Sequence, residues 1–297
     1  MKYLFLLSFV VLQFSLVAQR DFSKVEIKAL EVTDNIHILE GSGGNIGVFQ
    51  GDDGVIIIDT QFAPLTEKIK TAISVLTEHD IKYVLNTHWH GDHTGGNENF
   101  GNDGAIIVAQ NNVFERLTKD QMMKAFNREV KASPKAAWPT ITFEETMQIH
   151  LNGEPLQLIH VHNAHTDGDS FVYFPESNVI HMGDCFFAGR FPFIDLGSGG
   201  SIDGAIKAVQ VALMLTNSGT KIIPGHGKLS NKSDLLKYYT MLVTMRDRVL
   251  SAMDEGKSLE DMKVGNLGEG YEDWGSGFIS LEKFLDTIWT DYNRDEE

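Results

Sequence analysis

Short apolar runs separated by turn residues mark the first part of the chain. The sequence Gly51-Asp52-Asp53-Gly54 lies between the apolar runs Asn45–Phe49 and Val55–Ile58 and is typical of a hairpin turn. After Val55–Ile58, the apolar residues Ile69, Ile73 and Leu76 recur at helical spacing within Pro64–Glu78, which predicts an amphipathic helix. The runs that predict strands are Ile36–Leu39, Asn45–Phe49, Val55–Ile58, Ile81–Leu85 and Ala105–Ala109.

The second part of the chain repeats this order of strands followed by helix. A helical region is expected from Asn111 to about Lys131, before Ser133-Pro134. Asp203 is expected to cap a later helix, and Ser230 or Ser233 to open a long final helix. Strands are expected from near Phe143, then over Met147–Leu151, Leu156–Val161, Phe171–Phe174, Val179–Met182 and Lys221–Ile223.

Strands with helix, followed by strands with helix again, predict an α/β (α+β) protein. Two mixed sheets packed face to face, with helices outside, satisfy this order. The sequence has no Pro- or Ser-rich linker, so we interpret residues 19–297 as a single domain.

The first 18 residues are typical of an export signal. Lys2 supplies a positive charge, Tyr3–Val17 is almost wholly apolar, and Ala18 is a small residue for cleavage. The mature chain is expected to begin near Gln19, in the periplasm or outside the cell, with no stable membrane span after cleavage. An uncleaved anchor is the alternative interpretation.

Charge and cysteine content narrow the function further. The chain of 297 residues has 25 basic and 41 acidic residues, a formal net charge of −16, and no basic run. This argues against a nucleic-acid partner, because phosphate binding needs clustered Lys and Arg. Cys185 is the only cysteine, which excludes an internal disulfide. The partner is therefore expected to be a small-molecule substrate, and no pattern indicates an oligomeric state.

The segment His88-Trp89-His90-Gly91-Asp92-His93 directly follows an expected strand. Four of its six residues can bind metal. Alternating residues can direct His88 and His90 toward one point, and Asp92 and His93 toward a neighbouring one, as a site for two metals requires. A His-rich surface loop is the alternative.

Three further candidates, His165, Asp184 and His226, each lie beside an expected strand. Taken singly, a His at a strand end is more often a surface or hydrogen-bonded residue than a ligand. Four such segments in one chain are much harder to explain without a metal site.

In this order the residues resemble the metallo-β-lactamase superfamily, over roughly Ile36 to Lys228. The resemblance implies a four-layer αββα sandwich with metals at one edge. It implies one zinc held by His88, His90 and His165, with Asp184 bridging both ions. The second zinc of the two expected per chain would be held by Asp92, His93 and His226.

Two nearby residues allow alternative interpretations. Asp59 ends an apolar run and either steadies the ligand loop by hydrogen bonds or simply caps a strand. Cys185 could replace Asp184 as ligand, as in one subclass of β-lactamases. Adjacent side chains at a strand end point in opposite directions, so we expect Asp184 to face the metals and Cys185 to be buried.

The expected activity is metal-dependent hydrolysis. Zinc lowers the pKa of bound water from about 15.7 to about 7, so a metal-bound hydroxide oriented by Asp92 can attack an ester, lactone, thioester or amide-type bond. Alternatives are a β-lactamase and a non-catalytic zinc-binding protein. Lactamases with a Cys ligand carry a Lys where Ala188 stands, and Arg190 is either an anion contact or a solvated residue.

Overall fold

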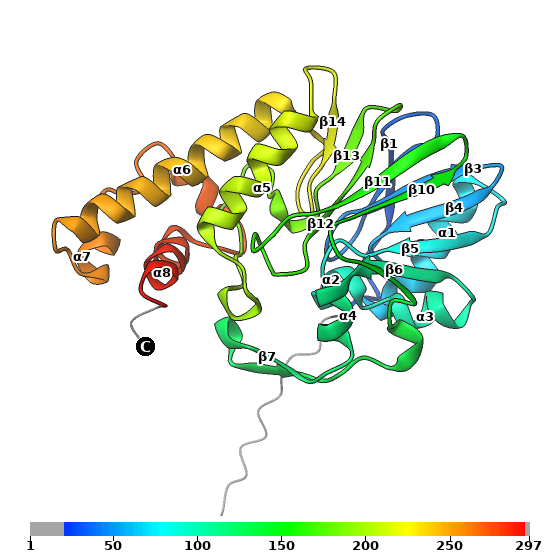
Figure 1. Ribbon diagram of the computed structural model, residues 1–297, viewed down its shortest axis with the longest axis horizontal. Coiled ribbons are helices and arrows are strands. Elements are labelled where there is room, and N and C mark those ends of the chain that lie inside the picture. Colours follow the sequence, from blue (N-terminus) through cyan, green and yellow to red (C-terminus); the bar gives the residue numbers. More distant parts are fainter. Residues whose placement is uncertain (1–20, 295–297) are drawn as a thin grey trace, which may run out of the picture.

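The computed structural model describes residues 21–294, so the expected signal segment lies outside the described residues. No helix within that range is long and apolar enough to cross a membrane. The described chain forms two large sheets with helices on their outer sides, and Figure 1 shows α1 (Thr66–Leu76) and α5 (Ile202–Leu215) at opposite sides of the sheets.

The first sheet has seven strands in the order β1-β2-β3-β4-β5-β6-β9. Antiparallel hairpins connect the first four strands, and the last three pair in parallel. These strands are Lys28–Glu31 (β1), Ile36–Glu40 (β2), Ile46–Gly51 (β3), Gly54–Ile58 (β4), Ile81–Leu85 (β5), Ile106–Gln110 (β6) and Ile141–Phe143 (β9). Its neighbouring helices are η1 (Ala63–Leu65), α1, α2 (Gly91–Thr94), α3 (Asn97–Asn102), α4 (Asn111–Leu117) and η3 (Lys135–Ala137).

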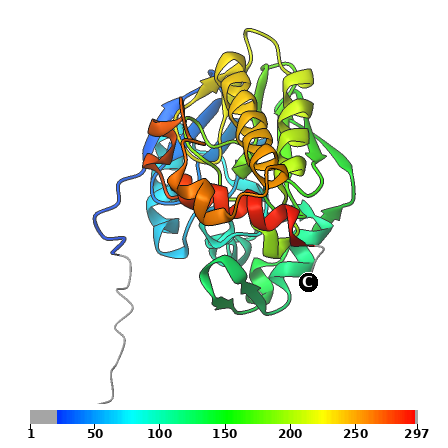
Figure 2. The same ribbon diagram turned by 90° about the vertical axis from the view of Figure 1, so that its left-hand side faces the viewer.

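The second sheet has six strands in sequence order, and only the β13–β14 pair is parallel. They are Thr146–Leu151 (β10), Glu154–His160 (β11), Ser170–Phe174 (β12), Val179–His181 (β13), Lys221–Ile223 (β14) and Ser230–Asn231 (β15). The helical elements of this half are η4 (Gly183–Cys185), η5 (Leu196–Ser198), α5, α6 (Lys232–Asp254), α7 (Leu259–Val264), η6 (Glu272–Ser276) and α8 (Leu281–Tyr292). Figure 2 shows α8 crossing below α6 on this face.

Three apolar layers hold the four structural layers together. Phe49 and Leu85 of the first sheet pack against Phe174 of the second sheet between the two sheets. On the outer face of the first sheet, Ile69 of α1 packs against apolar side chains of the strands of that sheet. Successive residues of a strand face opposite sides of the sheet. In β12, Val172 therefore lies in the layer between the sheets, and its neighbour Phe171 packs on the outer face toward α5, α6 and α8. The expected αββα sandwich is therefore confirmed.

The helix expected from Asn111 to about Lys131 is wrong beyond Leu117. After α4 the chain forms a hairpin of β7 (Gln121–Met123) and β8 (Arg128–Val130), joined by the turn η2 (Lys124–Phe126). Asp120 accepts hydrogen bonds from the backbone of Ala132 and from Lys131, which closes the hairpin. Met123 is buried against Trp89. These tertiary contacts override the helical propensity of the segment.

The helix starts also differ from expectation. Ser201, not Asp203, caps α5 by accepting the N–H of Gly204. Asn231 caps α6 by accepting two N–H groups, and α7 and α8 follow it, so α6 is not the final helix. Ser, Asn and Asp side chains can all cap a helix, and here such residues lie within one or two positions of each other. The sequence alone therefore does not show which of them is the cap.

Candidate metal centre

The candidate ligands meet at one edge of the two sheets. The first segment follows β5, where a bend carries His88, His90 is extended, and the turn of α2 then carries Asp92 and His93. His165 lies between β11 and β12, Asp184 lies in η4 after β13, and His226 follows β14. The carboxyl ends of parallel neighbours share one edge, so segments from distant parts of the sequence converge there.

The structure brings together all seven residues that the sequence singled out. His88, His90 and His165 form one group whose ligand atoms lie within 4.8 Å of one another, and Asp92, His93 and His226 form another. Within these groups, His90 Nδ1 is 2.8 Å from His165 Nε2, and His226 Nε2 is 3.4 Å from Asp92 Oδ2. The two groups are those that the family resemblance implied.

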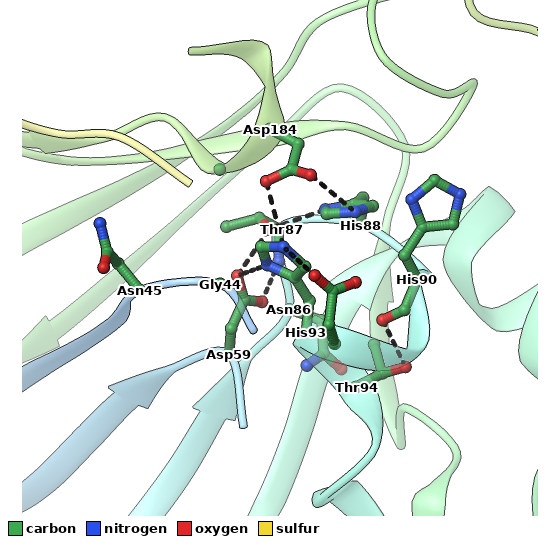
Figure 3. Close-up of polar contacts among 12 residues, drawn as sticks. Gly44, Asn45, Asp59, Asn86, Thr87, His88, His90, His93, Thr94 and Asp184 are labelled. Atoms are coloured by element: carbon green, nitrogen blue, oxygen red, sulfur yellow. Dashed lines mark hydrogen bonds and ion pairs between the residues drawn. The ribbon is translucent and has the colours of Figure 1, made fainter. Parts of the chain in front are cut away.

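Asp184 lies between the two groups, above His88 and His93 in Figure 3. Its Oδ1 is 3.1 Å from His93 Nε2, and its Oδ2 is 3.4 Å from His226 Nε2. The same Oδ2 is 3.6 Å from His165 Nε2 and 3.9 Å from His88 Nε2. One carboxylate is thus within reach of both groups.

Several of these atoms are buried without a hydrogen bond. His88 Nε2, His93 Nε2 and Asp184 Oδ1 are shielded from solvent and have no hydrogen-bond partner. Leaving a buried polar group unpaired costs about 1–3 kcal/mol, so three such atoms facing one another require an explanation. Cations at this position would satisfy all three, and imidazole with carboxylate is a donor set that zinc accepts. The residues present therefore fit a metal centre.

Two histidines of the first group, His88 and His165, are held in their neutral form. Burial lowers the pKa of His165 to about 4. Burial, together with the neighbouring His93 and His165, holds the pKa of His88 well below its usual value. Neutral imidazole is the form that binds metal, so these side chains need not lose a proton first.

The second group holds positive charge. Burial opposes protonation of His226, but Asp184 and Asp92 raise its pKa to about 9. Burial likewise opposes protonation of His93, and Asp184 and Asp59 raise its pKa well above the usual value. Burial alone would raise the pKa values of Asp92 and Asp184, yet the two histidines hold both below the usual range. Carboxylates that attract protons here would also attract a metal cation.

Asp59 supports the ligand loop directly. It is fully buried and accepts hydrogen bonds from the backbone N–H and the hydroxyl of Thr87, at 2.8 and 2.7 Å. Its Oδ2 also lies 2.7 Å from His93 Nδ1 (Figure 3). Of the two sequence interpretations, hydrogen bonding to the ligand loop is the one observed. Such contacts fix which ring nitrogen faces a metal.

Sequence reasoning missed Asp195, the corresponding partner of His90. Asp195 Oδ2 lies 3.0 Å from His90 Nε2, so His90 Nδ1 is left to face His165. Asp195 is buried and also accepts hydrogen bonds from the N–H and the hydroxyl of Ser198. Burial would raise the pKa of Asp195, but the bond to His90 lowers it to about 2. No motif marks this residue, which is 105 positions from His90.

Asn45 was also missed, and it positions the loop of His226. Its Nδ2 donates to the carbonyls of Pro224 and Gly227, both at 2.9 Å, and its backbone N–H donates to Gly225 at 2.7 Å. Gly225 itself needs to lack a side chain, because a Cβ there would lie 2.0 Å from Asp184 Oδ1. The two loops can therefore close around the centre.

Cys185 belongs to none of the candidate ligand groups among the described residues. It is buried in the apolar layer under α5 and α6, and burial raises the pKa of its thiol well above the usual value. The expected burial of Cys185 is observed, but Asp184 and Cys185 lie in the turn η4 rather than at a strand end. Arg190 is exposed, and Trp89 packs in a core cluster.

Histidines without a motif have other roles. His160 Nδ1 lies 2.8 Å from the Asp169 carbonyl, and exposed His162 lies 3.0 Å from Glu145. His181 Nε2 contacts the Asn45 carbonyl at 3.1 Å. None of these three belongs to the two groups.

Comparison with known proteins agrees with the fold. The family model described as "Metallo-beta-lactamase superfamily" matches residues 39–226. Among curated proteins, the chain is 24% identical over 233 residues to "Beta-lactamase-like protein 2 homolog" of Caenorhabditis elegans, covering 76% of this chain and 70% of that protein. It is 27% identical over 145 residues to "2,4-dinitroanisole O-demethylase subunit alpha" of a Nocardioides strain, covering 47% and 40%.

Solved structures give the same result. A metallo-β-lactamase from Pontibacter korlensis superposes with a TM-score of 0.60 at 18% identity, covering 73% of this chain and 99% of that one. The stereoselective inverting sec-alkylsulfatase Pisa1 from Pseudomonas sp. superposes with a TM-score of 0.67 at 16% identity, covering 90% of this chain and 50% of that one.

Proposed function

Because the chain belongs to the metallo-β-lactamase superfamily and is a metal-dependent hydrolase of that fold, we propose that it holds two zinc ions and hydrolyses a small-molecule substrate. The bond attacked is an ester, lactone, thioester or amide-type bond. The enzyme acts in the periplasm or outside the cell, after removal of residues 1–18, with residues 19–297 as one domain.

The position of Asp184 is the observation that carries this proposal. A closed structural zinc site needs only four ligands, whereas six side chains form two groups here and a seventh lies between them. In this proposal His88, His90 and His165 would hold one zinc, and Asp92, His93 and His226 would hold the other. Asp184, which is within reach of both groups, would be shared between them.

Two zinc ions would supply an acidified water and a Lewis acid for the attacked carbonyl oxygen. The chain supplies orientation. The Asp92 side chain is 30% exposed while that of Asp184 is 5% exposed, so Asp92 is the carboxylate that an entering water can reach. Asp92 is ionised at neutral pH, because its pKa lies below the usual range, and it would accept a hydrogen bond from that water and orient it.

The test combines metal content with a screen of bonds. Elemental analysis of zinc-reconstituted protein should give about two zincs per chain, as two ligand groups require. Asp184→Ala should lower this content, while His162→Ala should not, because His162 is an exposed histidine outside both groups. A content near zero after reconstitution would overturn the proposal.

The screen should include esters, lactones, thioesters, β-lactams and alkyl sulfates. β-Lactams represent the alternative that the enzyme is a β-lactamase, and alkyl sulfates represent the activity named for the Pseudomonas structure. Turnover of one of these substrate classes that is lost in Asp92→Ala and kept in His162→Ala would support the role of Asp92 in the reaction, as a ligand and as the group that orients the water. Zinc binding without turnover in any arm would favour a non-catalytic zinc protein.

A further inference from the structure

Three phenylalanine rings from distant segments meet beside the candidate centre. Phe126 lies 5.2 Å from Phe193 and 5.6 Å from Phe278, measured between ring centroids, and Phe193 lies 6.3 Å from Phe278. We call these three residues the phenylalanine cluster. The tilted and edge-on arrangements, at 43° to 86°, are those that aromatic rings prefer.

The cluster is continuous with one of the two ligand groups. The ring of Phe193 stacks on that of His90 at 5.7 Å and 29°, and lies 5.6 Å from the ring of His165. In addition, the Phe193 carbonyl lies 2.7 Å from His165 Nδ1. An apolar surface therefore begins at the first ligand group and extends outward over Phe126 and Phe278.

Exposure of this cluster is unusual for the molecule. Phe126 is 40% exposed and Phe278 is 66% exposed, and they are the only exposed aromatic side chains among residues 21–294. The other exposed large apolar residues are aliphatic. A contiguous apolar patch of this kind marks a binding site more often than scattered single residues do.

The cluster is built by segments around the common fold. Phe126 lies at the turn of the β7–β8 hairpin, and Phe278 precedes α8. Figures 1 and 2 both place this hairpin at the lower side of the molecule, below α8. Phe278 also lies outside the residues 39–226 that match the family model. The surface is therefore assembled from three segments far apart in the sequence, one of which lies outside the matched residues.

The exposed aromatic side chains lie on the side of the first ligand group. Beside the second group, Phe187 stacks on His226 at 5.3 Å and 14°, but its side chain is only 8% exposed. Among residues 21–294, the two exposed rings, Phe126 and Phe278, thus adjoin the first group, so a substrate with an apolar end would bind with that end on this side.

We propose that the phenylalanine cluster is the subsite for an apolar group of the substrate, an aryl ring or an alkyl chain of several carbons next to the bond that is hydrolysed. This inference rests on the proposed function. The apolar group would lie over Phe126, Phe193 and Phe278, on the side of His90 and His165, while the scissile bond reaches the ligand groups. The enzyme should then favour aryl or alkyl acyl compounds over acetyl compounds with the same scissile bond.

The test uses two inhibitors that share one metal-binding group. Acetohydroxamate and 3-phenylpropionohydroxamate differ only in the apolar part, so the ratio of their Kd values reports on that part alone. Isothermal titration of zinc-loaded protein should show the phenyl compound binding at least about tenfold more tightly. In the double variant Phe126→Ala, Phe278→Ala this ratio should fall toward one, while the zinc content stays at its wild-type value.

Two controls keep the result specific. Phe126→Leu, Phe278→Leu should recover much of the ratio, because leucine restores apolar surface. Met214→Ala should leave the ratio unchanged, because Met214 is 78% exposed but lies on α5. Thermal melts of each variant identify any that fail to fold. If the double alanine variant fails, Phe278→Ala alone replaces it, because Phe278 is 66% exposed, and the ratio should fall in this variant too.

The possible failures are distinguishable. If neither hydroxamate binds to zinc-treated wild-type protein, the proposed metal centre itself is wrong. If both bind with equal Kd, the proposed function stands and the subsite is overturned. If size-exclusion chromatography with light scattering shows a wild-type oligomer that the alanine variant converts to monomer, the cluster is an interface between copies of the chain, which also overturns the subsite.

Discussion

Replacing Asp195 by asparagine should weaken one of the two proposed zinc sites without altering any ligand. Asp195 Oδ2 lies 3.0 Å from His90 Nε2, and both side chains are buried. A carboxylate in this position holds the ring so that Nδ1 faces the metal, and it makes the imidazole a stronger ligand. The substitution Asp195→Asn keeps the shape of the side chain and an acceptor oxygen, but it removes the charge.

The magnitude follows from the charge that is lost. A hydrogen bond to a charged group contributes about 1.5–3 kcal/mol and one between neutral groups about 0.5–1.5 kcal/mol, so removing the charge should cost about 1–1.5 kcal/mol. Since 1.4 kcal/mol is a factor of ten in an equilibrium constant, the affinity of the first zinc site should fall roughly tenfold. Partners of metal-binding histidines in other proteins show a similar loss of about 10- to 100-fold when mutated. The second zinc site should be affected much less, because Asp195 has no contact with its ligands.

The assay is a zinc titration against a competing chelator, with the rate on the best substrate measured in parallel. Asp203→Asn is the matched control, because Asp203 is also a hydrogen-bonded carboxylate but binds Arg246 and Tyr292 beside α5. Thermal melts of the metal-free proteins identify any loss of fold. If both zinc affinities of Asp195→Asn stay within about twofold of the wild-type values, the reasoning is refuted. The charge of Asp195 would then contribute almost nothing to zinc binding by His90.

Three further predictions concern the same centre. Asn45→Ala should reduce kcat and the second zinc affinity together, because it frees the loop of His226, and titration should show both losses; unchanged values would mean the loop holds itself. Cys185→Ser should keep two zincs per chain while Asp184→Ala loses metal, and elemental analysis giving the reverse would make the cysteine a ligand. In metal-free protein the raised pKa of His226 should stabilise the fold fully below about pH 6.5, and this contribution should be lost as pH rises through about 9. Urea unfolding of chelator-treated protein should therefore show stability falling from pH 6.5 to pH 9, and a rise over this range would contradict the assignment.

The sequence predicted those features that depend on local pattern. Apolar runs such as Val55–Ile58 gave the strands, and the close spacing of His88, His90, Asp92 and His93 gave the ligand loop. The hairpin after α4 was missed, because burial of Met123 against Trp89 outweighs the helical propensity of its segment.

Long-range partners could not be found in the same way. Asp195 and Asn45 carry no motif, and each acts through a loop that is more than 100 positions distant. The phenylalanine cluster likewise unites residues 126, 193 and 278, which only the folded chain brings together. Asp59 was predicted in part. Its position after a strand marked it as a candidate, but only the structure showed its hydrogen bonds to Thr87 and His93.

The most direct test of the central claim is the zinc content of the wild type and of two ligand variants, one from each group. After reconstitution and removal of excess metal, the wild type should hold about two zincs per chain. His90→Ala and His226→Ala should each retain about one, because each removes a ligand from a different group while Asp184 and the other group remain. Two zincs in both variants, or none in the wild type, would contradict the account.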